Sequence, residues 1–106
     1  MQFAKQLRAG IRRGRIRSTV RIWQRPRVKE GGRYEMEGGH VVVDSIEPIR
    51  MMDITYDLAR ESGFASVDEL LKIARHGSGR NVYLIRFHYL PSGAWPSLAR
   101  GRRQSG

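Results

Sequence analysis

The segment GRIRSTVRIW at residues 14–23 constrains the fold most, because its side chains alternate in type with the two-residue period of a β-strand. One face of that strand would carry aliphatic and small side chains, namely Ile16, Ser18, Val20 and Ile22. The opposite face would carry polar and aromatic side chains, namely Arg15, Arg17, Thr19, Arg21 and Trp23. We expect the first face to pack in a core and the second to face solvent, where guanidinium and indole groups suit contact with a nucleic-acid strand.

Positive charge is concentrated near the two ends of the chain. Of the 20 Lys and Arg residues, ten lie in residues 1–29, which contain no acid, and three lie in residues 100–106. Residues 30–99 carry seven basic and ten acidic side chains, so the net charge of +10 arises at the ends. A basic zone gains affinity for phosphates by releasing their counterions, which predicts a polyanionic partner such as RNA, DNA or an anionic lipid surface.

Composition and hydropathy exclude several classes of protein. The chain contains no cysteine, so it has neither a disulfide framework nor a thiolate metal site. His40, His76 and His88 are not spaced as metal ligands, and we expect neither a metal nor a cofactor. No apolar run approaches the roughly 18 residues that span a bilayer, which favours a soluble, cytoplasmic protein without a membrane partner. Residues 1–13 are basic and amphipathic, and a docked helix is favoured there over a transit peptide or a membrane-surface helix.

Local signals predict the order of helices and strands. The expected helices are residues 2–13, 54–61 and 67–75, and the expected strands are residues 15–23, 33–36, 40–51 and 81–90. Asp53 is predicted to cap the second helix, and Ser66 with Glu69 to form the capping box of the third. Pro48 is expected to bend the long strand or to take it out of its ladder.

One domain followed by a tail is the expected organisation. A length of 106 residues suits a single hydrophobic core. We place that domain at residues 1–90. Residues 91–106 are rich in Pro, Gly, Ser and Arg and are predicted to form a basic, flexible C-terminal tail.

The expected elements follow one another in the order helix, basic strand, glycine turn, long strand, helix hairpin and apolar strand. Four sequence motifs mark this order. They are GRIRSTVR at 14–21, VKEGGRY at 28–34, ESGFASVDELL at 61–71 and VYLIRF at 82–87. In this order they resemble the ASCH domain, a family of the PUA-like superfamily, over residues 7–90. The resemblance implies an α+β fold, in which an N-terminal helix and a helix hairpin flank a small mixed β-barrel. It also implies a cleft between the basic strand and the hairpin, and a role in RNA binding or processing.

Bacterial acetylcytidine amidohydrolases are similar to this chain in size and layout, and the chain matches part of their pattern G-x-K-x-x-T-x-R. Thr19 and Arg21 match the threonine and the arginine, whereas Ile16 stands at the lysine position. The glutamate of these enzymes aligns with Ser62, next to Glu61. An isoleucine can neither activate water nor stabilise developing charge, so we do not expect their mechanism to operate here.

The candidate site residues come from these motifs. The predicted RNA contacts are Arg15, Arg17, Arg21, Trp23, Lys29, Tyr34 and His76, and the candidate catalytic pair is Thr19 and Glu61. Plainer interpretations stay open for these residues. The arginines and Trp23 could form a solvated basic strand face, the Tyr34 ring could close the barrel, and Glu61 could be exposed at a helix end. Arg86 and His88 are expected to share one side of the last strand and to extend the basic cleft.

Three functions remain open from the sequence. The favoured one is a domain that holds single-stranded RNA in a basic cleft. The alternative is a hydrolase, either a metal-independent ribonuclease or an enzyme acting on a modified nucleoside such as acetylcytidine. The third is an adaptor whose basic ends hold ribosomal RNA while the barrel meets a protein partner.

Overall fold

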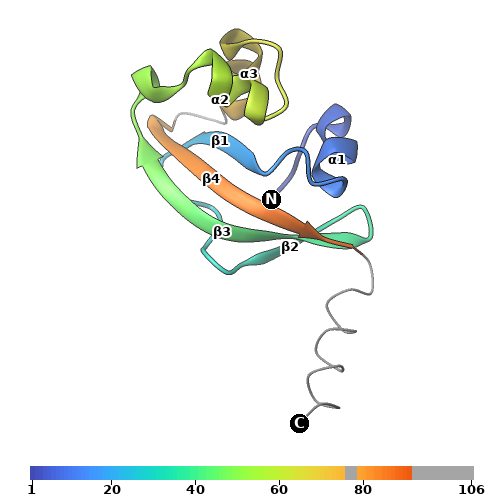
Figure 1. Cartoon of the computed structure of the whole chain (residues 1–106). Helices are drawn as coiled ribbons and strands as arrows, with labels where there is room; N and C mark the ends of the chain where they lie inside the picture. The colour runs from blue at the N-terminus through green and yellow to red at the C-terminus, as the bar shows by residue number, and fades with distance from the viewer. Residues whose placement is uncertain (76–78, 92–106) are drawn as a thin grey trace, which may run out of the picture.

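The computed structural model of the chain describes residues 1–75 and 79–91 (Figure 1). Its strands are β1 (Ser18–Trp23), β2 (Arg33–Met36), β3 (Gly39–Ile49) and β4 (Asn81–Leu90). Its helices are α1 (Lys5–Arg12), α2 (Tyr56–Glu61) and α3 (Val67–Ala74), with a 3₁₀-helix at Met51–Asp53. The predicted order of these elements is confirmed, and no boundary differs from its prediction by more than three residues. His76 and residues 92–106 of the predicted tail lie outside the described residues.

The four strands form one antiparallel sheet in the order β1-β4-β3-β2. The sheet curls into about half of a barrel (Figure 1). In this view α2 and α3 lie above β1, and α1 lies to the right of β1. This arrangement confirms the α+β class. No helix within residues 1–75 and 79–91 has the length and apolar character needed to cross a membrane.

Both faces of β1 are buried, because other segments wrap around this strand. Val20 and Ile22 on one face belong to a hydrophobic cluster that includes residues of α1, α2 and α3. On the other face Trp23 joins a second cluster with Val28 from the β1–β2 loop, and Arg21 lies over the ring of Phe3 from the N-terminal segment. The prediction that this second face meets solvent is therefore wrong for Thr19, Arg21 and Trp23, whereas Arg15 and Arg17, which precede β1, are exposed as predicted. All six residues of β1 are buried, since the loop and the N-terminal segment cover the side that alternation alone leaves open.

The irregularity in β3 lies nearer the start of the strand than expected. The pairing of β3 with β4 shifts register between Val43 and Ser45, so the bulge is at Asp44. Pro48 stays in the ladder, opposite Tyr83. Because β2 pairs with β3 only as far as Val42, the strand around Pro48 has an unpaired edge, which is where a sheet tolerates proline.

Helix capping follows the sequence in part. Thr55, rather than Asp53, caps α2, because its hydroxyl accepts a hydrogen bond from the Leu58 N–H at 3.2 Å. Asp53 instead accepts from the Arg50 N–H at 2.8 Å and closes the 3₁₀ turn. Ser66 caps α3 as predicted, accepting from the Glu69 N–H at 3.2 Å.

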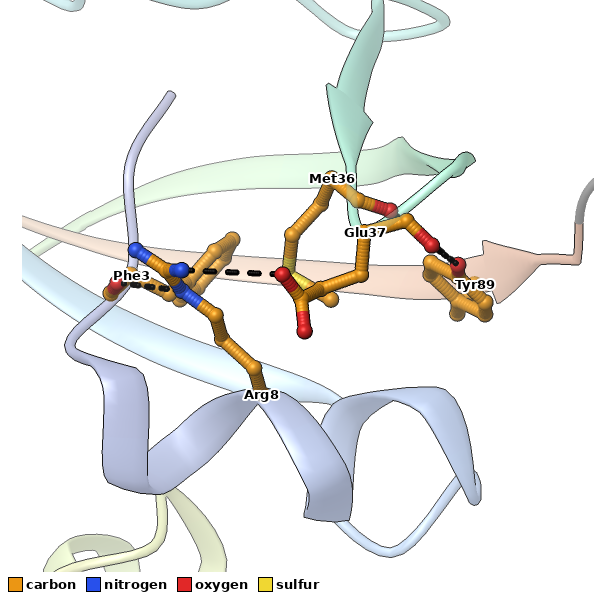
Figure 2. Close-up of polar contacts among 5 residues, drawn as sticks. All are labelled: Phe3, Arg8, Met36, Glu37 and Tyr89. Atoms are coloured by element: carbon orange, nitrogen blue, oxygen red, sulfur yellow. Dashed lines mark hydrogen bonds and ion pairs between the residues drawn. The ribbon is translucent and has the colours of Figure 1, made fainter.

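A tight hairpin joins β2 to β3 and holds the N-terminal segment in place (Figure 2). Glu37 and Gly38 have φ values of 52° and 82°, the left-handed pair that a two-residue turn between twisted strands requires. The Tyr89 hydroxyl donates to the carbonyls of Met36 at 3.0 Å and Glu37 at 3.2 Å. Arg8 forms an ion pair with Glu37 at 3.6 Å, and its Nε donates to the Phe3 carbonyl at 3.1 Å (Figure 2). These contacts fix the backbone that precedes α1.

Candidate nucleic-acid interface

An open hollow of about 320 Å³ lies where the α1–β1 loop, β4 and the end of α2 meet. It is lined by Arg15, Arg17, Ser18, Glu61 and Arg86, and we call it the arginine hollow. Its volume is at the small end of the range for ligand sites. Three guanidinium groups and one carboxylate therefore share a space that suits one small group or a single nucleotide unit.

The end of α1 sets the direction of the two loop arginines. Gly14 takes a φ of 75°, which reverses the chain after the last helical turn. The N–H groups of Arg15 and Ile16 then donate to the Gly10 carbonyl at 2.9 Å and 3.2 Å. This closed helix end leads directly into β1, so the loop that carries Arg15 and Arg17 is short and tied at both ends.

Ile16 anchors the loop to two helical segments. Its side chain packs so closely on α1 and on the α2–α3 connection that a Cβ on Gly10 or on Gly63 would lie 2.7 Å from its Cδ1 atom. Ile16, which stands where the acetylcytidine amidohydrolase pattern has a lysine, is thus a packing residue here. With Ile16 turned inward, its neighbours Arg15 and Arg17 are both exposed.

One buried hydroxyl group lines the hollow, and a second lies within hydrogen-bonding distance of it. Ser18 lines the hollow and is 4% exposed, and Ser62, at the end of α2, is 1% exposed. Their Oγ atoms are 3.2 Å apart, within hydrogen-bonding distance. This contact joins β1 to the end of α2 at the residue next to Glu61, so the glutamate is held close to the arginines.

The positive charges of the arginine hollow are only partly balanced by its single carboxylate. Within residues 1–75 and 79–91, neither Glu61 nor any of the three arginines forms an ion pair. The hollow therefore has an excess of two positive charges, with all the guanidinium groups able to meet a ligand. His88 is exposed on the same side of β4 as Arg86, as predicted, and its Nδ1 lies 2.8 Å from Asp44 Oδ1.

The predicted site residues divide between the two sides of β1. Arg15, Arg17 and Glu61 line the arginine hollow together with Ser18. Thr19 and Arg21 point to the opposite face, where Arg21 Nε donates to Thr19 Oγ1 at 3.3 Å. The structure does not bring Thr19 and Glu61 together as a catalytic pair. Trp23 is 4% exposed, and its indole lies against Tyr83 with ring centroids 6.3 Å apart, so it offers no open stacking surface.

Lys29 and Tyr34 lie in and next to the β1–β2 loop and do not line the arginine hollow. The Tyr34 hydroxyl accepts a hydrogen bond from the Lys29 N–H at 3.0 Å. Its ring packs against the cluster of Trp23 and Val43. Tyr34 therefore closes the loop, which agrees with the plainer interpretation of this ring, while the Lys29 residue is exposed.

A second, smaller cavity lies on the other face of β1. Its volume is about 230 Å³, and it is lined by Met1, Gln2, Arg21, Trp23, Arg27 and Val28. We call it the Arg21 cavity. Burial lowers the pKa of Arg21 to about 10, so this guanidinium remains charged at neutral pH.

A larger hollow, of about 470 Å³, lies at the junction of β3 and β4 and contains none of the residues that the sequence marks as a site. Its Arg50 is already paired with Asp53 at 3.6 Å. The arginine hollow has more unpaired positive charge in less space.

In the part of the chain that the structure describes, no three His, Asp or Glu side chains gather as a metal site would require.

Sequence reasoning found Arg15, Arg17 and Glu61 but not the part played by Ser18. The signal for Ser18 is its position next to Arg17 at the start of β1, opposite Arg86 in the β1–β4 register. That register becomes visible only once the two strands are paired.

Comparison with known proteins assigns no family to this geometry, since no protein-family model, curated protein or solved structure matches the chain. The ASCH domain and the PUA-like barrel therefore stay predictions that rest on the sequence motifs.

Proposed function

We propose that this protein binds single-stranded RNA at the arginine hollow. The observation that carries the proposal is the convergence of Arg15 and Arg17, from the α1–β1 loop, with Arg86, from β4, around one open hollow. Arg86 is about 70 positions from the other two in the sequence, so the fold and not a local run of charge brings it to them.

A phosphate backbone is the ligand that best fits this charge. Guanidinium groups bind phosphate oxygens through two parallel hydrogen bonds, and these three have no ion-pair partner elsewhere in the described residues. The whole chain has a net charge of +10, which attracts a polyanion over a longer range. Binding would release counterions and would therefore weaken as salt is added.

The shape of the hollow favours a single strand over a duplex. A space of about 320 Å³ accommodates one splayed nucleotide unit, whereas a duplex presents its phosphates on a convex surface that does not enter such a hollow. Glu61 supports RNA in particular. Its carboxylate is only an acceptor, and RNA supplies the 2′-hydroxyl as a donor that DNA lacks.

The proposal is confined to binding. Hydrolysis would need a nucleophile or water next to a base, and Thr19 and Glu61, the candidate pair, face opposite sides of β1. The finer assignment, to an ASCH domain with a PUA-like barrel, is part of the proposal. It is supported by the motifs at residues 14–21 and 61–71, which lie in β1 with its preceding loop and in the helix hairpin.

Fluorescence anisotropy with a labelled uridine oligonucleotide tests the proposal. The test variant replaces Arg15, Arg17 and Arg86 by alanine. The control variant removes the same charge from three exposed residues outside the hollow, Arg25, Lys72 and Arg75. We expect the test variant to lose at least about tenfold in affinity and the control to lose much less. Equal losses of affinity in the two variants would mean that binding depends only on net charge, which would contradict the proposal.

A further inference from the structure

Arg21 is a buried cation without an acidic partner. It is 6% exposed, and within residues 1–75 and 79–91 it forms no ion pair. Its Nη2 donates to the Gln2 carbonyl at 2.6 Å, its Nε donates to Thr19, and its guanidinium carbon lies 5.1 Å from the centre of the Phe3 ring. These hydrogen-bonding and ring partners are neutral, and the nearby Met1 ammonium is itself a cation, whose pKa is lowered by burial and by the charge of Arg21.

Such an environment is unfavourable for a charge unless something else compensates it. Buried arginines ordinarily pair with a carboxylate, because removal from water costs more than neutral hydrogen bonds return. Arg21 has a third nitrogen, Nη1, for which the described residues supply no hydrogen bond. The side chain also borders open space, namely the Arg21 cavity.

The lining of this cavity suits an anion. A second guanidinium, that of the exposed residue Arg27, borders the same space, and no acidic side chain lines it. Its volume of about 230 Å³ falls below the roughly 300 Å³ at which sites for whole small molecules begin. This volume equals nearly eight water volumes at roughly 30 Å³ each, enough for one tetrahedral oxyanion and its remaining waters.

We propose that the Arg21 cavity binds a phosphate group, with Arg21 as its buried floor and Arg27 at its rim. Two guanidinium forks can hold separate oxygens of one phosphate, which is the geometry that arginine favours. The site is distinct from the arginine hollow, because the two lie on opposite faces of β1. Phosphate binding at this site is therefore independent of RNA binding at the arginine hollow.

Calorimetric titration of the untagged chain with inorganic phosphate tests the site directly, at constant ionic strength set by chloride. We expect saturable binding to the wild type that is retained when Arg15, Arg17 and Arg86 are replaced by alanine. In that triple-alanine background, which removes phosphate binding by the arginine hollow, Arg21→Met should lose binding and Arg27→Ala should bind at least about tenfold more weakly. Arg25→Ala is the matched control from the same loop, and it should bind as the wild type does. Arg27→Ala alters an exposed side chain, so its result holds even where Arg21→Met fails to fold.

A second arm uses a phosphate monoester, glycerol phosphate, to identify the source of the group. Equal affinity for both ligands means that the phosphate group alone is recognised, and tighter binding of the monoester means that the ligand is a phosphorylated molecule. The proposal is overturned if neither ligand binds in the millimolar range, or if Arg27→Ala binds phosphate as tightly as Arg25→Ala. The variant lacking Arg15, Arg17 and Arg86 should keep its phosphate binding in the Arg21 cavity, which separates this result from any failure of RNA binding.

Discussion

Arg21 is held in an environment that opposes its charge. Burial without a carboxylate lowers its pKa to about 10, and the charged form is retained at neutral pH. Replacing Arg21 by methionine removes this desolvation cost but also removes hydrogen bonds to Gln2 and Thr19. We expect the relief of the desolvation cost to exceed the loss of hydrogen-bond energy, so that Arg21→Met raises the free energy of unfolding by about 1 kcal/mol.

Urea denaturation in phosphate-free buffer measures this change. A clear loss of stability in Arg21→Met would show that the neutral contacts of Arg21 outweigh the cost of its burial. Added phosphate should narrow the difference in the free energy of unfolding between Arg21→Met and the wild type. A ligand that binds only the folded wild type stabilises that protein by mass action.

Among the described residues, Glu61 is the carboxylate that lines the arginine hollow, and we expect it to favour RNA over DNA. Glu61→Gln removes a negative charge, so we expect both nucleic acids to bind more tightly. The ratio of RNA affinity to DNA affinity should nevertheless fall by roughly threefold to tenfold, since the charged acceptor for a 2′-hydroxyl is lost.

Paired titrations with uridine and deoxyuridine oligonucleotides of equal length give this ratio. Glu47→Gln is the matched control, because Glu47 is exposed on β3 and does not line the hollow. An unchanged ratio in Glu61→Gln would mean that the carboxylate does not contact the sugar.

At the scale of elements, the contact between α1 and the helix hairpin determines where the loop arginines lie. Gly63 has a φ of 92°, and a Cβ there would come within 2.7 Å of side-chain atoms of both Ile16 and Leu7. Gly63→Ala therefore combines backbone strain with overpacking and should cost about 2 to 4 kcal/mol of stability.

Gly31→Ala is the control for backbone strain alone. Gly31 has a φ of 76°, and a Cβ at this position would have no neighbouring atom within 4 Å, so the replacement should cost only about 1 kcal/mol. Equal losses in the two variants, measured by thermal or urea unfolding, would show that the packing of Ile16 on Gly63 contributes nothing.

The same elements show what a sequence can and cannot predict. The strands and helices follow from local signals such as the Ser66 cap and the alternation in residues 14–23. The burial of Arg21 and Trp23 does not, because alternation gives the two faces of a strand without saying which segments cover each. Phe3 and the β1–β2 loop cover the second face, and neither carries a local signal for that contact.

At the scale of the whole molecule, the charge distribution predicts the kind of partner, and the fold selects the place. Arg15, Arg17 and Glu61 were identifiable from the sequence as candidates. Their meeting with Arg86 depends on the antiparallel pairing of β1 with β4, which places Ser18 opposite Arg86. Long-range pairing of this kind has no signature in a single sequence, so a charge count alone could not locate the hollow.

The salt dependence of RNA binding tests the central claim most directly. For single strands, the logarithm of the affinity falls with the logarithm of salt concentration by about 0.7 for each phosphate that the protein neutralises. We therefore predict that alanine at Arg15, Arg17 and Arg86 lowers the steepness of this dependence by about 2 relative to the wild type. The charge-matched variant at Arg25, Lys72 and Arg75 should keep the steepness of the wild type. An unchanged slope in the hollow variant would contradict the account, because it would mean that RNA phosphates do not meet these three arginines.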